Sequence, residues 1–177
     1  MVPSGELLAA FRLPLSPNIE SIGVLPFTFL DGKIYILMGQ EIKTNKLISF
    51  GSTVYQKEKD LFEEISKRLF ESSRGIFGNT FEMISKLKYS PALIRGTLAV
   101  IFLQINPELR ASARDSFLKT KPMASQDISD VRWVSLGNLK KLMSGEKKGM
   151  KSTLREILTL PGFDVIKAGL VSMTNSE

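Results

Sequence analysis

The segment Asp60-Leu-Phe-Glu-Glu-Ile-Ser-Lys-Arg-Leu-Phe-Glu-Ser-Ser-Arg-Gly75 contains the clearest helical pattern of the chain. Its apolar residues recur at helical spacing and form one stripe; they are Leu61, Phe62, Ile65, Leu69 and Phe70. A glycine just past the last turn is typical of a helix end, because glycine takes the left-handed conformation without strain. The pattern predicts one long amphipathic helix over Asp60–Ser73.

Runs of β-forming residues flank this helix on both sides. Ile22–Leu30 and Lys33–Gly39 precede it, and Asp31-Gly32 between them is typical of a tight hairpin turn. Leu47–Tyr55 is a shorter run that a glycine interrupts. After the helix, Thr97–Ile105 is a nearly continuous apolar run, which predicts a central strand buried on both faces.

The remaining predicted elements are shorter. They are helices at Asn79–Leu87, Pro107–Leu118, Leu136–Met143 and Ser152–Leu158, and a strand at Val131–Ser135. This order predicts an α/β (α+β) fold in which one long helix packs on a mixed sheet. We expect an irregular N-terminal arm over residues 1–20, a domain over 21–145, and a helical C-terminal extension over 146–177 packed on that domain.

The composition limits the chemistry that the chain can perform. Its 177 residues are 43% hydrophobic and 24% charged, which is typical of one packed domain. Cysteine and histidine are both absent. Thiol nucleophiles, Ser-His triads and zinc sites with Cys or His ligands are therefore excluded. Carboxylates, Lys, Arg, Tyr and hydroxyls remain, with or without an oxygen-bound metal such as Mg²⁺.

The net charge of +6 favours anionic partners such as a nucleotide, RNA or an acidic protein surface. A basic patch is predicted in the C-terminal quarter, where the cationic residues are Lys140, Lys141, Lys147, Lys148, Lys151 and Arg155. The longest apolar run, Leu98–Leu103, is too short to span a bilayer. We therefore expect no membrane partner and an intracellular, cytoplasmic location. The sequence leaves the oligomeric state open.

The order of elements and several local motifs resemble the Nudix superfamily. Ile22–Gly39 resembles the first Nudix hairpin, and Phe50-Gly51-Ser52 resembles the opening of the Nudix box. Arg68–Ile76 matches the frame of the box end, where the family has Arg-Glu, an aliphatic residue, any residue, Glu-Glu, any residue, then Gly and an aliphatic residue. Val131–Leu136 resembles the late strand. Over residues 20–145 the resemblance implies a Nudix-like α/β/α sandwich with a box-type helix.

The metal ligands of the box are missing from this sequence. The resemblance places its three metal-binding glutamates at Leu69, Ser72 and Ser73, and none of these is a carboxylate. Residues that match or lie near other box positions are Gly51, Asp60, Arg68 and Gly75. The resemblance thus implies a Nudix-fold protein that has lost ordinary hydrolase activity, holds no metal or cofactor, and binds a nucleotide, an RNA end or a protein.

Two alternatives stay open. The first is an active Nudix-type hydrolase of nucleoside diphosphate derivatives or capped RNA, with Mg²⁺ or Mn²⁺ held by displaced carboxylates such as Asp60, Glu63, Glu64 or Asp127. Its motive is that Lys59–Ser66 imitates the box end. The second is a structural or assembly protein that docks through the basic patch.

Five further residues are candidates for ligand binding, by stacking on a base or by pairing with a phosphate: Phe27, Phe50, Arg95, Arg132 and Trp133. In each case a role in the core or at a strand end is the alternative. The pattern of Ile22–Gln40 also resembles Nudix-like proteins of large DNA viruses, which adds a virion or virus factory as an alternative location.

Overall fold

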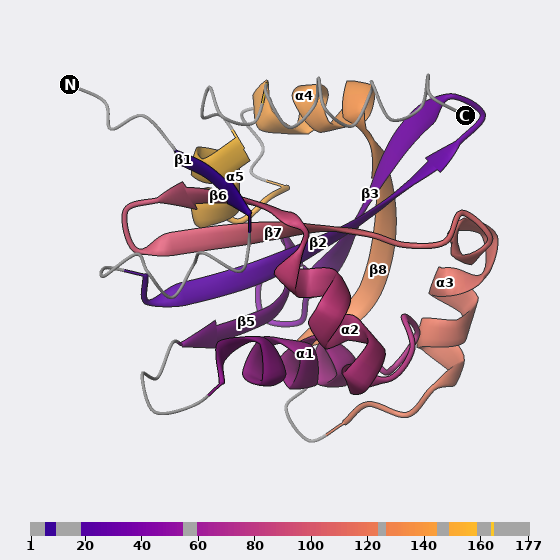
Figure 1. Ribbon diagram of the computed structural model, residues 1–177. Coiled ribbons are helices and arrows are strands. Elements are labelled where there is room, and N and C mark those ends of the chain that lie inside the picture. The colour runs from indigo at the N-terminus through magenta and orange to yellow at the C-terminus, as the bar shows by residue number, and fades with distance from the viewer. Residues whose placement is uncertain are drawn as a thin grey trace.

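The computed structural model describes residues 6–9, 19–54, 60–123, 127–144, 149–158 and 164. Within them a mixed sheet is covered by helices on both faces (Figure 1). The elements are β1 (Glu6–Ala9), β2 (Ser21–Leu30), β3 (Lys33–Glu41), β4 (Leu47–Ile48), β5 (Phe50–Val54), α1 (Leu61–Ser72), α2 (Thr80–Lys88), β6 (Pro91–Arg95), β7 (Leu98–Gln104), α3 (Leu109–Lys119), β8 (Ile128–Ser135), α4 (Leu136–Ser144) and α5 (Ser152–Leu158).

The strand order explains why β2 and β7 are the most buried strands. The order is β1-β6-β7-β2-β3-β4, while β5 also pairs with β2 and β8 with β3. β2 and β7 run parallel to each other, and the other pairs are antiparallel. The predicted hairpin turn is confirmed, since Asp31 and Gly32 have φ values of 50° and 70°.

Two hydrophobic clusters lie on the two faces of the sheet. One contains Leu61, Phe62, Ile65 and Leu69 of α1 together with Met83 and Leu87 of α2. The other contains Leu139 of α4 and Leu154 of α5. The expected sandwich of helices, mixed sheet and helices is therefore confirmed (Figure 1). None of the described helices is long and apolar enough to cross a membrane.

The structure differs from the sequence predictions at the sheet edge. Glu6–Ala9, in the segment expected to be an irregular arm, forms β1 and pairs with β6. β6 itself, Pro91–Arg95, was not predicted. Both segments are short and lack alternation, and β1 contains Glu and Ala, which have low strand propensity. Of the predicted C-terminal extension the structure describes α5 and its immediate flank, and the rest of 146–177 stays a prediction.

A buried arginine joins the end of α1 to α3 and β8. Arg74 is 9% exposed and has a φ of 55°. Its Nη1 donates to the carbonyls of Phe117 at 2.9 Å and Thr120 at 3.1 Å, and its Nη2 to that of Ile128 at 3.4 Å. The guanidinium also lies 3.9 Å from the centre of the Phe117 ring. Burial lowers the pKa of Arg74, but a guanidinium stays charged in proteins.

We expect Arg74→Met to lower the free energy of unfolding by about 3 kcal/mol, because buried carbonyls lose a charged donor. Urea denaturation measures the change. Arg68→Met is the matched control, since Arg68 pairs with Glu64 and Glu71 at the surface and such pairs contribute less than about 1 kcal/mol. Equal losses in the two variants would contradict the role assigned to Arg74.

Candidate functional site

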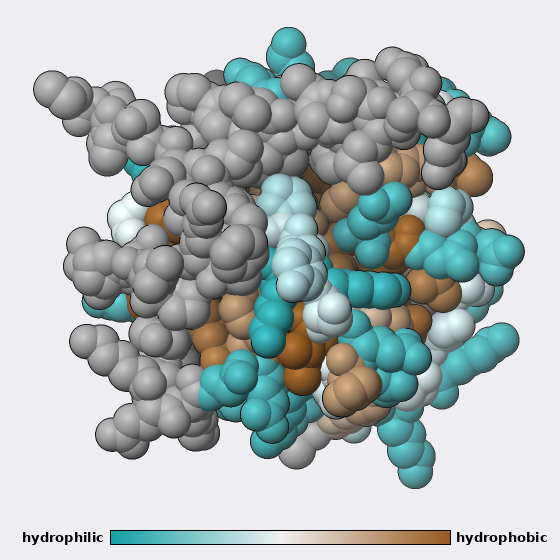
Figure 2. All heavy atoms as spheres, viewed as in Figure 1, coloured by the Kyte–Doolittle hydropathy of each residue, from teal (hydrophilic) through white to brown (hydrophobic). Residues whose placement is uncertain are grey.

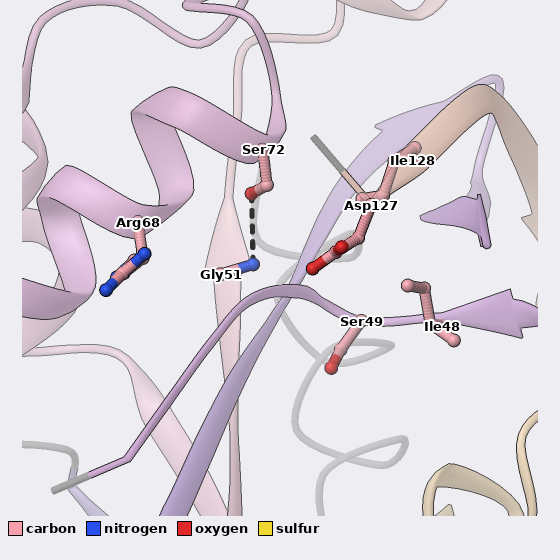
Figure 3. A pocket seen from close by; sticks show the side chains of 7 residues that line it. All are labelled: Ile48, Ser49, Gly51, Arg68, Ser72, Asp127 and Ile128. Carbon is pink, nitrogen blue, oxygen red and sulfur yellow. Dashed lines mark hydrogen bonds between the residues drawn. The ribbon is translucent and has the colours of Figure 1, made fainter. Parts of the chain in front are cut away.

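A small pocket lies where the remnant box folds back on the sheet (Figure 3). It is bounded by the β4–β5 junction, the last turns of α1 and the start of β8. Its lining residues are Ile48, Ser49, Gly51, Arg68, Ser72, Asp127 and Ile128. The cavity measures about 70 Å³. This is small beside the roughly 300–1,000 Å³ of pockets that hold drug-sized ligands.

Gly51 and Ser72 fasten α1 to β5 at this pocket. Gly51 has a φ of 64°, and its N–H donates to Ser72 Oγ at 3.0 Å, drawn in Figure 3. Ser72 Oγ in turn donates to the carbonyl of Leu69 at 3.3 Å. A Cβ at position 51 would lie 3.1 Å from the backbone nitrogen of Leu69. Glycine is required here both by its φ and by this close approach.

The three positions that resemble the metal-binding glutamates have structural contacts. Leu69 is 1% exposed and belongs to the core beneath α1. Ser73 is also buried, and its hydroxyl donates to the carbonyl of Phe70 at 3.4 Å. Of the three, only Ser72 lines the pocket, with its hydroxyl in the contact with Gly51.

The carboxylates expected to replace these ligands lie apart. Asp60 caps α1, accepting from the N–H groups of Phe62 at 3.0 Å and Glu63 at 3.1 Å. Glu63 is exposed in the first turn, and Glu64 pairs with Arg68 at 3.4 Å. Among the described residues no three Asp or Glu side chains come together.

These contacts do not fit a bound Mg²⁺. A divalent cation of this kind needs several oxygen ligands, carboxylates foremost. Asp127 is the one carboxylate among the lining residues, and its side chain points into the pocket in Figure 3. The cationic Arg68 lines the opposite wall. Arg68 pairs there with Glu64 and Glu71, so Asp127 is the carboxylate that the described lining residues offer to a cation, and one carboxylate does not supply the several oxygen ligands.

The five candidate ligand-binding residues are not brought together. Phe27 and Phe50 are buried in the two different hydrophobic clusters, so neither presents a face to a ligand. Arg95 donates to the carbonyl of Glu156 at 3.2 Å and joins β6 to α5. Arg132 is exposed on β8, and Trp133 is half-buried beside it. A ligand-binding role for these five residues stays a prediction.

An arginine that the sequence analysis did not single out covers Trp133. The guanidinium carbon of Arg110, on α3, lies 5.8 Å from the centre of the Trp133 ring and 4.5 Å from that of Tyr35. Arg110 thus lies over one face of the Tyr35 ring and near the Trp133 ring. The contact joins β3, β8 and α3, and no sequence pattern within one element predicts it.

Four of the six residues of the predicted basic patch lie in the described part of the chain. Lys140 and Lys141 are exposed on α4. Lys151 is exposed and lies 3.6 Å from Glu41, and Arg155 is half-buried in α5. Lys147 and Lys148 lie outside the described residues. The patch therefore stays a prediction, and within it Lys151 is paired with Glu41.

The solved structures that are similar to this chain include Nudix proteins. No protein-family model matches the sequence, and no curated protein sequence matches it significantly. A binary complex of the C. elegans Ap4A hydrolase is 12% identical, covering 85% of this chain and 98% of its own, with a TM-score of 0.49. The NUDIX domain of Shewanella oneidensis NrtR, complexed with ADP ribose, is 12% identical, covering 70% and 77%, with a TM-score of 0.39.

A MutT/nudix family protein from Enterococcus faecalis is 10% identical, covering 66% of this chain and 44% of its own, with a TM-score of 0.36. All three are Nudix proteins, the superfamily that the sequence resembles. Their sequence identities to this chain are low and their TM-scores lie below 0.5, so the similarity says nothing about the activity of this chain.

We expect Ser72→Ala to lower the free energy of unfolding by about 1 kcal/mol, because the N–H of Gly51 loses its acceptor. Ser85→Ala on the exposed face of α2 is the matched control for helix propensity. Hydrogen exchange gives a local measurement: the amide proton of Gly51 should exchange faster in Ser72→Ala than in Ser85→Ala. Unchanged exchange would show that the Gly51–Ser72 contact does not fasten α1.

An ion pair beside the pocket predicts a pH dependence. Arg114 Nε and Nη2 donate to Asp130 Oδ1 and Oδ2 at 3.0 and 2.9 Å, joining α3 to β8. The bond from Arg114, helped by the N–H of Val131, holds the pKa of Asp130 below its ordinary value. An aspartate whose pKa is lower in the folded than in the unfolded chain stabilises the folded state at any pH above its unfolded-state pKa of about 3.9. This contribution is lost as the pH falls through the folded-state pKa of Asp130.

The stability difference between the wild type and Asp130→Asn should therefore be complete at pH 7 and shrink as the pH falls below about 4. Urea denaturation at a series of pH values measures it. Asp31→Asn in the hairpin turn is the control, because asparagine also tolerates a positive φ. A difference that stays constant down to pH 3 would refute the assignment.

Proposed function

We propose that this chain is a Nudix-like domain that does not hydrolyse pyrophosphate bonds and acts by binding. The observation that carries the proposal is the state of the three box positions. Leu69 is part of the core, Ser73 is buried, and Ser72 accepts from the N–H of Gly51. The helix face that resembles a metal site is used instead to attach α1 to β5.

The electrostatics of the pocket support the same proposal. Arg68 lies on the α1 wall of the pocket and pairs with Glu64 and Glu71 at 3.4 and 3.8 Å, so both carboxylates are engaged by a cation of the same helix. Asp127 alone does not supply the oxygen ligands of Mg²⁺. Without the metal, neither the polarisation of the phosphoryl oxygen nor the activation of water is available.

The size of the pocket supports binding elsewhere on the domain. A cavity of about 70 Å³ is well below the roughly 300–1,000 Å³ of ligand pockets. A partner that is anionic, as the net charge of +6 favours, would therefore contact an outer surface of the domain.

The test is turnover of diadenosine tetraphosphate and of ADP-ribose, the ligands suggested by the names of two similar structures. With Mg²⁺ or Mn²⁺, we expect no product above the rate in buffer, and titration calorimetry should show no metal binding. Turnover by the wild type that Asp127→Asn abolishes, with Asp31→Asn as the control, would replace the proposal with an enzyme that uses a displaced carboxylate.

A further inference from the structure

The solvent side of α2 carries two exposed aromatic residues on one stripe. Phe81 is 85% exposed, and Tyr89, the C-cap residue of the helix, is 77% exposed. Because a helix turns about 100° per residue, residues four positions apart lie on nearly the same side. Phe81, Ser85 and Tyr89 therefore form a stripe, which we call the α2 stripe. It lies opposite the buried residues of the helix, Met83 and Leu87.

The α2 stripe is complementary to itself when it is turned end to end. It has a large residue at each end and a small one, Ser85, in the middle. If the α2 of a second copy lies antiparallel against it with a two-fold axis at Ser85, Phe81 of each copy lies beside Tyr89 of the other. The small serine at the crossing point lets the two helices approach closely. Ridges of residues four apart are those that interdigitate in the commonest class of helix packing.

The charged residues beside the α2 stripe are also complementary to themselves. Glu82 and Lys86 are exposed on one flank of the stripe, and among the described residues neither takes part in an ion pair. A two-fold axis between antiparallel helices brings the same flank of both copies together. Glu82 of one copy is then only about 3 Å along the helix axis from Lys86 of the other. Opposite charges meet twice, which favours a second copy of this chain as the occupant.

The other described residues around α2 do not oppose this arrangement. Lys88, on the other flank of the stripe, is half-buried, and its ammonium lies 6.0 Å from the centre of the Phe62 ring. The two copies of Lys88 would lie about 9 Å apart along the helix axis, so their repulsion is largely screened at physiological salt. α2 lies on the side of the molecule that faces the viewer in Figures 1 and 2, where hydrophobic and hydrophilic side chains are mixed.

We propose that the α2 stripe is the docking surface for a second copy of this chain. The two helices cross at Ser85, the four aromatic side chains cover one another, and the Glu82–Lys86 pairs set the antiparallel direction. Four aromatic side chains bury roughly 600–1,000 Å² at most, which is less than the roughly 1,200–2,000 Å² of a stable interface. The dimer is therefore weak, with a Kd of roughly 10 μM to 1 mM.

The first experiment is sedimentation velocity of the full chain between about 10 μM and about 1 mM, because the dimer fraction grows with concentration. The wild type should shift from monomer to dimer over this range. Phe81→Ala/Tyr89→Ala should weaken the association at least about tenfold. Leu118→Ala, at an exposed residue of α3, is the matched control and should associate like the wild type. Circular dichroism and urea denaturation check that the variants are folded.

The second experiment exchanges charges. Glu82→Lys and Lys86→Glu should each weaken self-association, because like charges then face each other across the two-fold axis. An equimolar mixture of these two variants should associate more tightly than either variant alone, because opposite charges then meet at both ends of the contact. A mixture that associates no better than its components would overturn the antiparallel arrangement.

A cross-link tests the position of the two-fold axis. The chain contains no cysteine, so the thiol of Ser85→Cys is the only one in that variant. A disulfide needs Cα atoms within about 7 Å, and oxidation should therefore link Ser85→Cys far faster than Ser112→Cys, whose site is exposed on α3.

Three results would overturn the proposal: a monomer at every concentration, a dimer that the aromatic double variant does not weaken, or equal cross-linking of the two thiol variants. The α2 stripe is distinct from the box pocket, so the proposal stands whether or not that pocket hydrolyses a substrate. Turnover of a nucleoside diphosphate derivative would refute the proposed function without affecting this one.

Discussion

The close approach of β5 to the last turn of α1 is the constraint on which the domain depends. Gly51 takes a left-handed φ, and a side chain there would meet the backbone of Leu69. Its N–H is directed at the helix end and accepted by Ser72. Most of the apolar stripe of α1 is then buried on the sheet. Just past the same helix end, Arg74 donates hydrogen bonds to the carbonyls of Phe117 in α3 and Ile128 in β8. The hydroxyl of Ser72 attaches the end of α1 to β5 by accepting a hydrogen bond from the N–H of Gly51.

The charges around α1 agree with a helix that is kept for packing. Arg68 pairs with both Glu64 and Glu71 along the helix. Asp60 satisfies the free N–H groups of the first turn. Asp60, Glu64 and Glu71 thus each have a partner within α1. Binding of a divalent cation by these three would require their contacts to break. Among the described lining residues of the pocket, Asp127 is the carboxylate that lies outside α1.

The sequence predicted those elements whose stability comes from local patterns. The helix at Asp60–Ser73, the Asp31-Gly32 turn and the strand at Thr97–Ile105 have strong periodicity or turn chemistry, and the structure has all of them. β1 and β6 are stabilised by pairing with each other and with β7, which no local pattern encodes. The burial of the candidate residues Phe27 and Phe50 also depends on packing beyond their own strands.

Alternation along a strand shows that Phe27 and Phe50 each point to the same face of the sheet as the residues two positions away in their own strand. It does not show that each face is closed by helices. Likewise, the position of Arg110 over Tyr35 depends on how α3 packs on the sheet, which the sequence of α3 alone does not determine.

α2 differs from α1 in what it leaves outside, although the two helices are packed together. The hydroxyl of Ser66 donates to the carbonyl of Thr80 at 2.6 Å, and Asn79 caps the first turn of α2. Met83 and Leu87 anchor the helix in the core. Phe81 and Tyr89 are therefore displayed from a helix whose backbone is fixed at its start and along its buried face. Such a fixed backbone holds these two exposed side chains in place better than a loop would, because less conformational freedom remains to them.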